Sequence, residues 1–183
     1  MSEAADDGHI LESGENTSRG GTINAGDSKF LIGDNSSDRQ YRAIVSFDTS
    51  AMSDNARITS VVIKIKKYGL AGTDPFTTHQ ALKVGVRKPY FGNEVSLEVE
   101  DFQARAGMGT VGEFEDILLS DWYKATLKDT TCTYINLTGT TQFRLRFQLG
   151  DNDDEGADNL AFFSGNTKFI VDRPVLIVTY FLP

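Results

Sequence analysis

The stretch from Tyr41 to Lys67 constrains the fold more than any other part of the chain. Apolar residues occupy alternate positions from Ala43 to Phe47 and again from Val61 to Ile65, on either side of a turn-rich break. A period of two residues is typical of a half-buried β-strand, because successive side chains point to opposite faces of a sheet. The stretch therefore predicts two antiparallel strands joined by a short polar connection.

Similar short runs recur along the rest of the chain, with turn signals at intervals of roughly 8–12 residues. We expect strands near residues 8–12, 29–32, 41–47, 57–68, 81–87, 111–119, 122–127, 133–137, 143–149, 160–164 and 175–182. The last run is apolar on both faces, which is typical of a strand in the middle of a sheet or of one that is covered on both sides. One short helix is expected near residues 100–106.

These patterns predict an all-β fold, an antiparallel two-sheet β-sandwich that is jelly-roll-like and has at most one short helix. No 10- to 15-residue helical pattern alternates with the strands, which argues against a βαβ architecture. No shift in composition marks a linker, so we expect a single domain over residues 1–183, with residues 1–6 as a flexible lead-in.

The net charge of −8 narrows the classes of partner. A negative field disfavours nucleic acid and anionic lipid, and it favours cations such as calcium. No apolar run reaches the roughly 20 residues that a membrane span needs. The single cysteine, Cys132, excludes an intrachain disulfide and is expected to be a small buried side chain.

The densest carboxylate cluster suggests a metal. Residues 151–156 read D-x-D-x-E-G, like the opening of a calcium loop in which alternating oxygen ligands wrap the ion and the glycine permits a sharp bend. The candidate calcium ligands are Asp151, Asp153, Glu155 and Asp158, with Asp34 and Asp38 from another loop. The twelfth position of an EF-hand loop would be Phe162, so an EF-hand is excluded. The alternative is a solvated acidic loop without a metal.

Exposed rings suggest a sugar-binding surface, because aromatic side chains stack on sugar faces while polar groups bind the hydroxyls. The candidate ligand-binding residues are Trp122, Tyr123, Tyr90, Phe91, Tyr41 and Arg39. The alternative for each ring is ordinary packing in the core or at its rim. No nucleophile, phosphate-loop or metalloprotease motif is present, so we expect no enzymatic activity.

Several segments also resemble a known family. The pieces are the R-x-x-x-x-F-D pattern from Arg42 to Asp48, the ITSVVIKI run from Ile58 to Ile65, and the closing PVLIVTY from Pro174 to Tyr180. Together they resemble the DNRLRE-type β-sandwich domain of secreted prokaryotic proteins. That domain is related to carbohydrate-binding modules found beside alginate lyases and other polysaccharide-degrading enzymes. The resemblance implies a jelly-roll-like sandwich with an extracellular, non-catalytic role on glycans or surfaces.

Residues and resemblance together predict an extracellular or cell-surface polysaccharide-binding module that carries structural calcium. The alternative is a self-assembling surface or filament subunit, or an adhesin module, which packs against copies of itself. The polar N-terminal segment and the apolar last strand suit that alternative, because strand addition needs an exposed edge and a donor.

Overall fold

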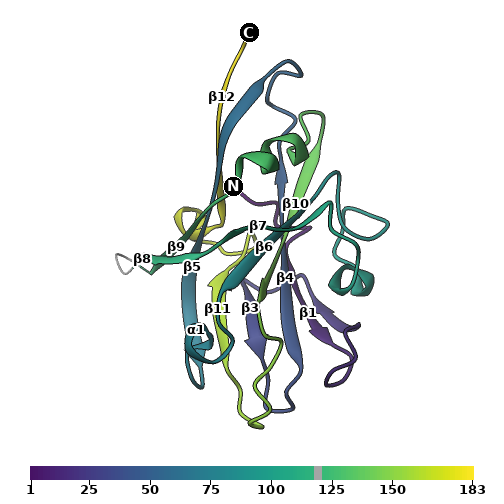
Figure 1. The fold of residues 1–183 in the computed structure, drawn as a ribbon, viewed down its shortest axis with the longest axis vertical. Helices are drawn as coiled ribbons and strands as arrows, with labels where there is room; N and C mark the ends of the chain where they lie inside the picture. The colour runs from purple at the N-terminus through teal and green to yellow at the C-terminus, as the bar shows by residue number, and fades with distance from the viewer. Residues whose placement is uncertain (118–120) are drawn as a thin grey trace.

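The fold is built almost entirely from antiparallel strands (Figure 1). A computed structural model describes residues 1–117 and 121–183. The strands are β1 (Gly8–Glu12), β2 (Gly20–Asn24), β3 (Lys29–Asp34), β4 (Gln40–Asp48), β5 (Arg57–Ala71), β6 (Leu82–Arg87), β7 (Met108–Glu113), β8 (Glu115–Ile117), β9 (Trp122–Thr126), β10 (Thr140–Phe147), β11 (Asn159–Phe163) and β12 (Val175–Phe181). One α-helical turn, α1 (Pro75–Thr78), and three 3-10 turns, η1 (Val99–Phe102), η2 (Asp129–Tyr134) and η3 (Ile170–Asp172), interrupt them.

The described strands follow one hydrogen-bonded path, β7-β6-β10-β4-β3-β11-β5-β9-β8, with β1, β2 and β12 attached at its sides. The two ends of this path meet along the chain, because only Phe114 separates β7 from β8. The Lys128 N–H also donates to the Val111 carbonyl at 2.8 Å, which ties β7 to the segment after β9. The sheet is therefore nearly closed and barrel-like.

The long strand β5 joins the two sides of this barrel. Its residues Lys67–Ala71 pair with β11, whereas its earlier residues pair with β12 on one edge and with β9 on the other. We call β7, β6, β10, β4, β3 and β11 the large sheet. The first part of β5 together with β12, β9 and β8 is the small sheet.

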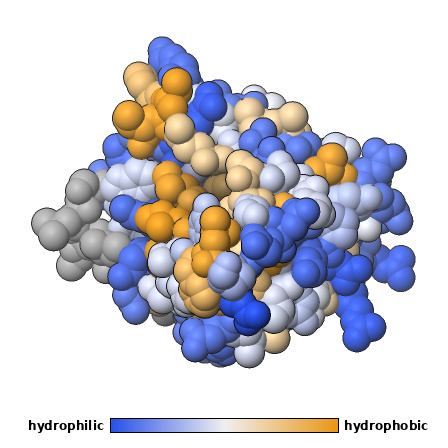
Figure 2. Space-filling model, turned by 90° about the horizontal axis from the view of Figure 1, so that it is seen from above, coloured by the Kyte–Doolittle hydropathy of each residue, from blue (hydrophilic) through white to orange (hydrophobic). Residues whose placement is uncertain are grey.

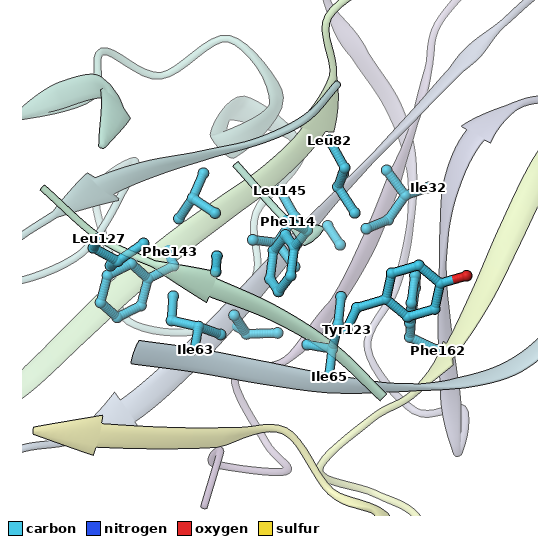
Figure 3. Packing of buried hydrophobic residues seen from close by; sticks show 14 of the residues in the cluster. Ile32, Ile63, Ile65, Leu82, Phe114, Tyr123, Leu127, Phe143, Leu145 and Phe162 are labelled. Carbon is cyan, nitrogen blue, oxygen red and sulfur yellow. The ribbon is translucent and has the colours of Figure 1, made fainter. Parts of the chain in front are cut away.

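The main core lies between these two sheets (Figure 3). Residues from the large sheet include Ile32, Leu82, Phe143, Leu145 and Phe162, and those from the small sheet include Ile63, Ile65 and Tyr123, with Leu127 just after β9. All of them are at most 5% exposed. Alternating apolar residues on facing strands thus produce the core that the sequence pattern predicts.

A second, smaller cluster covers part of the opposite face of the large sheet. It contains Ile10, Ile44, Phe91, Leu97 and Phe102. The loop that follows β6 and the turn η1 supply three of these side chains, so this loop packs flat on the sheet. The rest of that outer face, near the ends of β4 and β10, is polar.

The structure confirms the all-β, antiparallel character of the chain, but it differs from the expectations in several elements. The expected helix near 100–106 is only the 3-10 turn η1, and the one α-helical turn is instead α1, which begins at Pro75 after the Asp74 N-cap. The expected strand at 133–137 lies partly in the 3-10 turn η2. Strand β2 has the sequence GGTIN, which is typical of a loop because it is rich in glycine and shows no alternation of apolar residues.

Two differences concern the chain ends. Strand β12 was expected inside a sheet, but among the described strands it pairs only with β5 and so lies at an edge. Residues 1–6 were expected to be a flexible lead-in, yet they pack on the barrel. The Ser2 N–H donates to the Pro174 carbonyl at 3.0 Å, and the Glu3 N–H donates to the Ser46 carbonyl at 2.8 Å.

Candidate functional site

A polar pocket of about 200 Å³ lies on the outer face of the large sheet. It is lined by Glu12, Asn16 and Ser18 from β1 and the turn after it, Gln40 and Arg42 from β4, Arg146 from β10, and Gln148, Gly150 and Asp151 from the following loop. The alternation of β4 and β10 places these side chains there. Odd-numbered residues such as Val45 and Phe143 enter the core, so the even-numbered neighbours point outward.

Three arginines, Arg42, Arg144 and Arg146, form a row on this face. Two of them donate hydrogen bonds to other groups of the protein. Arg144 Nη1 donates to the carbonyls of Asp101, Phe102 and Ala104 at 2.8–3.1 Å. Arg42 donates to Gln40 Oε1 and to the Phe102 carbonyl, and its guanidinium lies 3.9 Å from the centre of the Phe102 ring. Both groups therefore anchor the loop around η1 on the sheet.

Burial and the closeness of the three positive charges change the pKa values of two of these arginines. Burial, and then the neighbouring Arg144 and Arg146, lower the pKa of Arg42 to about 10. Burial and Arg146 lower the pKa of Arg144 to about 10 as well. Both side chains stay charged at neutral pH. A negative charge near the row would lessen the repulsion among these three like charges.

Arg146 is the arginine of the row that lines the pocket with most of its N–H donors not bonded to described residues. Within the described part of the chain it donates one long hydrogen bond, 3.5 Å from Nη1 to the Phe147 carbonyl. Its guanidinium forms no ion pair with any described carboxylate. A planar guanidinium with free N–H groups can bind a carboxylate or two adjacent hydroxyls in bidentate geometry.

The two carboxylates of the pocket differ in role. Glu12 is structural, because its Oε1 accepts from the Ser18 N–H at 2.5 Å and its Oε2 accepts from the Gln40 N–H at 3.3 Å. Asp151 is half-buried and forms no ion pair with a described cation. Burial raises its pKa, and Asp153 with the other nearby carboxylates raises it further. Asp151 and Arg146 thus offer an acceptor and a donor to the same small space.

The predicted calcium ligands lie at one end of the barrel. Three of them act as braces between loops, because they accept hydrogen bonds from the backbone of a neighbouring loop. Asp34 Oδ1 accepts from the Asp158 N–H at 2.9 Å, and Asp158 Oδ1 accepts from the Thr73 N–H at 2.7 Å. Asp38 Oδ1 accepts from the Glu155 N–H at 3.2 Å. Thr73 follows Gly72, where a Cβ atom would lie 1.8 Å from the Ala157 carbonyl oxygen, so only glycine permits this close approach of the loops.

A buried histidine completes these braces. His79 Nε2 lies 3.1 Å from Asp34 Oδ2, and both side chains are fully buried. In residues 1–117 and 121–183 no three His, Cys, Asp or Glu side chains are grouped to hold a metal ion.

The structure does not bring the predicted ligand-binding rings together. Tyr123 is 4% exposed and Phe91 is fully buried, so the expectation that these rings stack on a ligand is corrected. Tyr123 packs edge-on against Phe162 in the main core, and Phe91 lies under the Arg144 guanidinium in the second cluster. Both rings complete apolar clusters, which removes them from contact with solvent.

The other predicted residues lie at separate places. Trp122 is half-buried on the outer face of the small sheet, with Lys64 Nζ 5.1 Å from its ring centre. Tyr41 packs edge-on against His9, and Tyr90 is half-buried in the loop after β6. Arg39 donates to the carbonyl of Glu12, which lines the polar pocket, but Arg39 itself is not a lining residue.

The sequence pattern predicts Asp151 as a calcium ligand and does not group it with Gln40, Gln148 and Arg146. The outward alternation of β10 was visible in the sequence as Arg144, Arg146 and Gln148. What the sequence did not show is that β10 pairs with β4, with Arg144 opposite Ile44. That long-range register is what sets Arg146 beside the polar end of β4.

No protein-family model and no curated protein matches the chain. Among solved structures, the chain is similar to a mutant of Xylanase10C from Cellvibrio japonicus in complex with xylopentaose, with a TM-score of 0.44 and 10% sequence identity. The match covers 98% of this chain and 29% of that chain, so the chain spans less than a third of that protein. No helix of the described residues is long and apolar enough to cross a bilayer.

Proposed function

We propose that the protein is a non-catalytic, extracellular glycan-binding module whose binding site is the polar pocket on the large sheet. The observation that carries this proposal is the convergence of Arg146, Gln148 and Asp151 in one open pocket. Guanidinium and amide N–H groups donate to sugar hydroxyls and sugar carboxylates, and side-chain carboxylates accept from sugar hydroxyls. The resemblance to the DNRLRE-type domain supports the proposal, and with it a jelly-roll-like reading of the barrel.

In this proposal Arg146 binds a sugar carboxylate, whereas Asp151 accepts from sugar hydroxyls. Arg146 supplies a charge-assisted donor, while no aromatic ring is among the pocket's described lining residues. Binding in this pocket therefore depends on hydrogen bonds and charge rather than on ring stacking. Trp122, on the other sheet, lies outside it.

Arg146→Gln tests the site, because it removes the charge and the fork of N–H donors but keeps a polar, uncharged side chain. We expect at least tenfold weaker binding to an acidic polysaccharide in affinity electrophoresis or calorimetry, since a charge-assisted hydrogen bond contributes about 1.5–3 kcal/mol. Arg105→Gln is the matched control, because Arg105 is exposed and does not line the pocket.

Two outcomes would contradict the proposal. One is equal binding by the Arg146→Gln and Arg105→Gln variants, which would move the site elsewhere. The other is no retention of the unaltered protein on any acidic or neutral polysaccharide. Size analysis of the recovered polysaccharide tests the non-catalytic part, because a lyase or hydrolase would shorten it.

Calcium at the acidic end of the barrel remains part of the proposal. It is supported by the grouping of carboxylates in the 151–158 loop with Asp34 and Asp38, which hydrogen bonds join to that loop. A cation would offset the repulsion among these groups, which adds to burial in raising the pKa of Asp151. The braced carboxylates would have to exchange backbone N–H partners for the ion, so binding would involve a local rearrangement of the 151–158 loop.

The second candidate function is a self-assembling surface subunit. One observation favours it: β12 is an exposed edge strand that carries apolar side chains. An edge of this kind is a template for pairing with another chain. Oligomeric state in solution, measured over a range of protein concentrations, separates this candidate from a monomeric binding module.

A further inference from the structure

Strand β12 leaves one edge of the small sheet open. Among the described strands it pairs only with β5, and the register runs from Val175 opposite Lys64 to Phe181 opposite Arg57. Natural edge strands are commonly protected by charged side chains, especially lysine. From Val175 to Pro183 the chain contains no Asp, Glu, Lys, Arg or His, although the whole protein carries a net charge of −8.

The apolar side chains around this edge are exposed at both of its ends. At the start, Phe169, Ile170 and Val171 are exposed, Val171 to 82%. At the far end, Phe181 and Leu182 are 52% and 58% exposed. Figure 2 shows hydrophobic residues gathered over the end of the molecule from which the C-terminus projects. In an antiparallel pair of β12 strands, the start of each strand would lie beside the end of the other, so the two exposed groups would cover each other.

The space behind β12 is also open. A pocket of about 220 Å³ lies between the inner face of β12 and the end of β4, with apolar side chains such as Leu176, Val178 and Phe47 and the polar residues Asp48 and Thr49 in its lining. Among the described strands, none pairs with the free edge of β12 beside this pocket. A strand added to the edge would cover the mouth of this pocket and place alternate side chains into it, as in β-strand addition.

We propose that two copies of this chain pair through β12, antiparallel and across a two-fold axis, so that the two small sheets become one continuous sheet. The occupant is a second copy because the edge is self-complementary: it is uncharged along its length, and its apolar groups lie at opposite ends. A two-fold axis makes such a contact closed, which gives a dimer rather than a filament. The inference rests on the self-assembly candidate and is independent of the glycan site.

The experiment places a charge on the outer face of the edge. Ile177 is 46% exposed and lies outside the pocket, so Ile177→Lys and Ile177→Glu should leave the fold intact, as circular dichroism will show. Analytical ultracentrifugation of the unaltered protein should show a monomer–dimer equilibrium. Each variant alone should have a dissociation constant at least tenfold higher, because like charges then meet across the axis.

Mixing the two variants is the decisive step, since Lys and Glu would then face each other and dimers should return. Leu70→Lys is the matched control, because Leu70 is also 46% exposed but β5 is paired with β11 at that point. Three results would overturn the proposal: a monomer at every concentration, an Ile177→Lys variant that dimerises with the dissociation constant of the unaltered protein, or no recovery on mixing. The second would leave self-assembly standing through another surface, whereas the first would remove both.

Discussion

Asp7 is the residue whose burial has the clearest energetic consequence. Its carboxylate is fully buried, with Oδ1 accepting from the Ser46 N–H at 2.8 Å and Oδ2 accepting from the Gly165 N–H at 3.1 Å. It thereby ties the N-terminal segment to β4 and to the loop after β11. Burial raises its pKa to about 7, even though both hydrogen bonds act in the opposite direction.

A raised pKa makes the folded state bind the proton more tightly than the unfolded state does. The contribution of Asp7 to the free energy of unfolding is therefore greatest below about pH 4 and is lost as the pH rises to about 7. Asp101, whose pKa burial raises to about 6, acts in the same direction. His9 acts in the opposite direction, because burial lowers its pKa to about 4 and stability then rises from about pH 4 to 6.5.

We predict that Asp7→Asn removes one component of this pH dependence. Relative to the unaltered protein, the variant should gain roughly 2–3 kcal/mol of unfolding free energy between pH 5 and pH 8, because it carries no charge to bury. Urea denaturation at the two pH values measures the difference. Asp54→Asn is the control, since Asp54 is exposed. Parallel pH profiles for all three proteins would show that Asp7 does not bury a titrating charge.

At the scale of elements, β11 shows how alternation separates core from surface within two residues. Phe162 is fully buried, with its ring centre 5.8 Å from that of Phe30 and 5.4 Å from that of Tyr123. Phe163 points the other way and meets only the exposed Tyr68 edge-on at 5.1 Å among the described rings. Substitutions at these two neighbouring residues therefore probe the two faces of one strand.

We predict that Phe162→Ala lowers the free energy of unfolding by about 3–5 kcal/mol, because it leaves a cavity between the two sheets. Phe163→Ala should lower it by no more than about 1 kcal/mol, since the site opens to solvent. Thermal or urea unfolding followed by fluorescence measures both. Similar losses for the two variants would contradict the inward and outward assignment of β11.

An element could be predicted from the sequence when the pattern of alternating apolar residues that marks it lies within one continuous segment. Strands β4, β5 and β10 were found because their alternation is complete within one segment. The burial of Tyr123 was also readable, since Tyr123, Ala125 and Leu127 alternate with polar residues and so mark the inward face. Its aromatic character had suggested a ligand, but the period of the strand decides which way it points.

The placement of β12 and the polar pocket required information that the sequence does not contain. Apolar residues on both faces usually mean a central strand. Here Leu176 and Val178 line a gap between the sheets while Ile177 is exposed, so the same pattern occurs at an edge. The pocket joins β1, β4 and β10, and only the pairing of distant strands brings Glu12 and Gln40 close to Arg146.

For the molecule as a whole, the negative charge is concentrated at the end of the barrel near residues 151–158. We predict that a chelator lowers the melting temperature if calcium occupies this end, because an ion bound only to the folded state stabilises it. Asp153→Asn should lessen the effect of the chelator, while Asp54→Asn should not. An unchanged melting temperature, in protein that elemental analysis shows to hold no calcium, would remove calcium from the proposal.

The position of β12 also determines how the molecule would carry tension. Ser2 is bonded to Pro174 at the start of the strand, and Pro183 lies just beyond its far end (Figure 1). A pull between these two points runs along the strand axis. The hydrogen bonds between β12 and β5 then bear the load together in shear, instead of breaking one after another from one end.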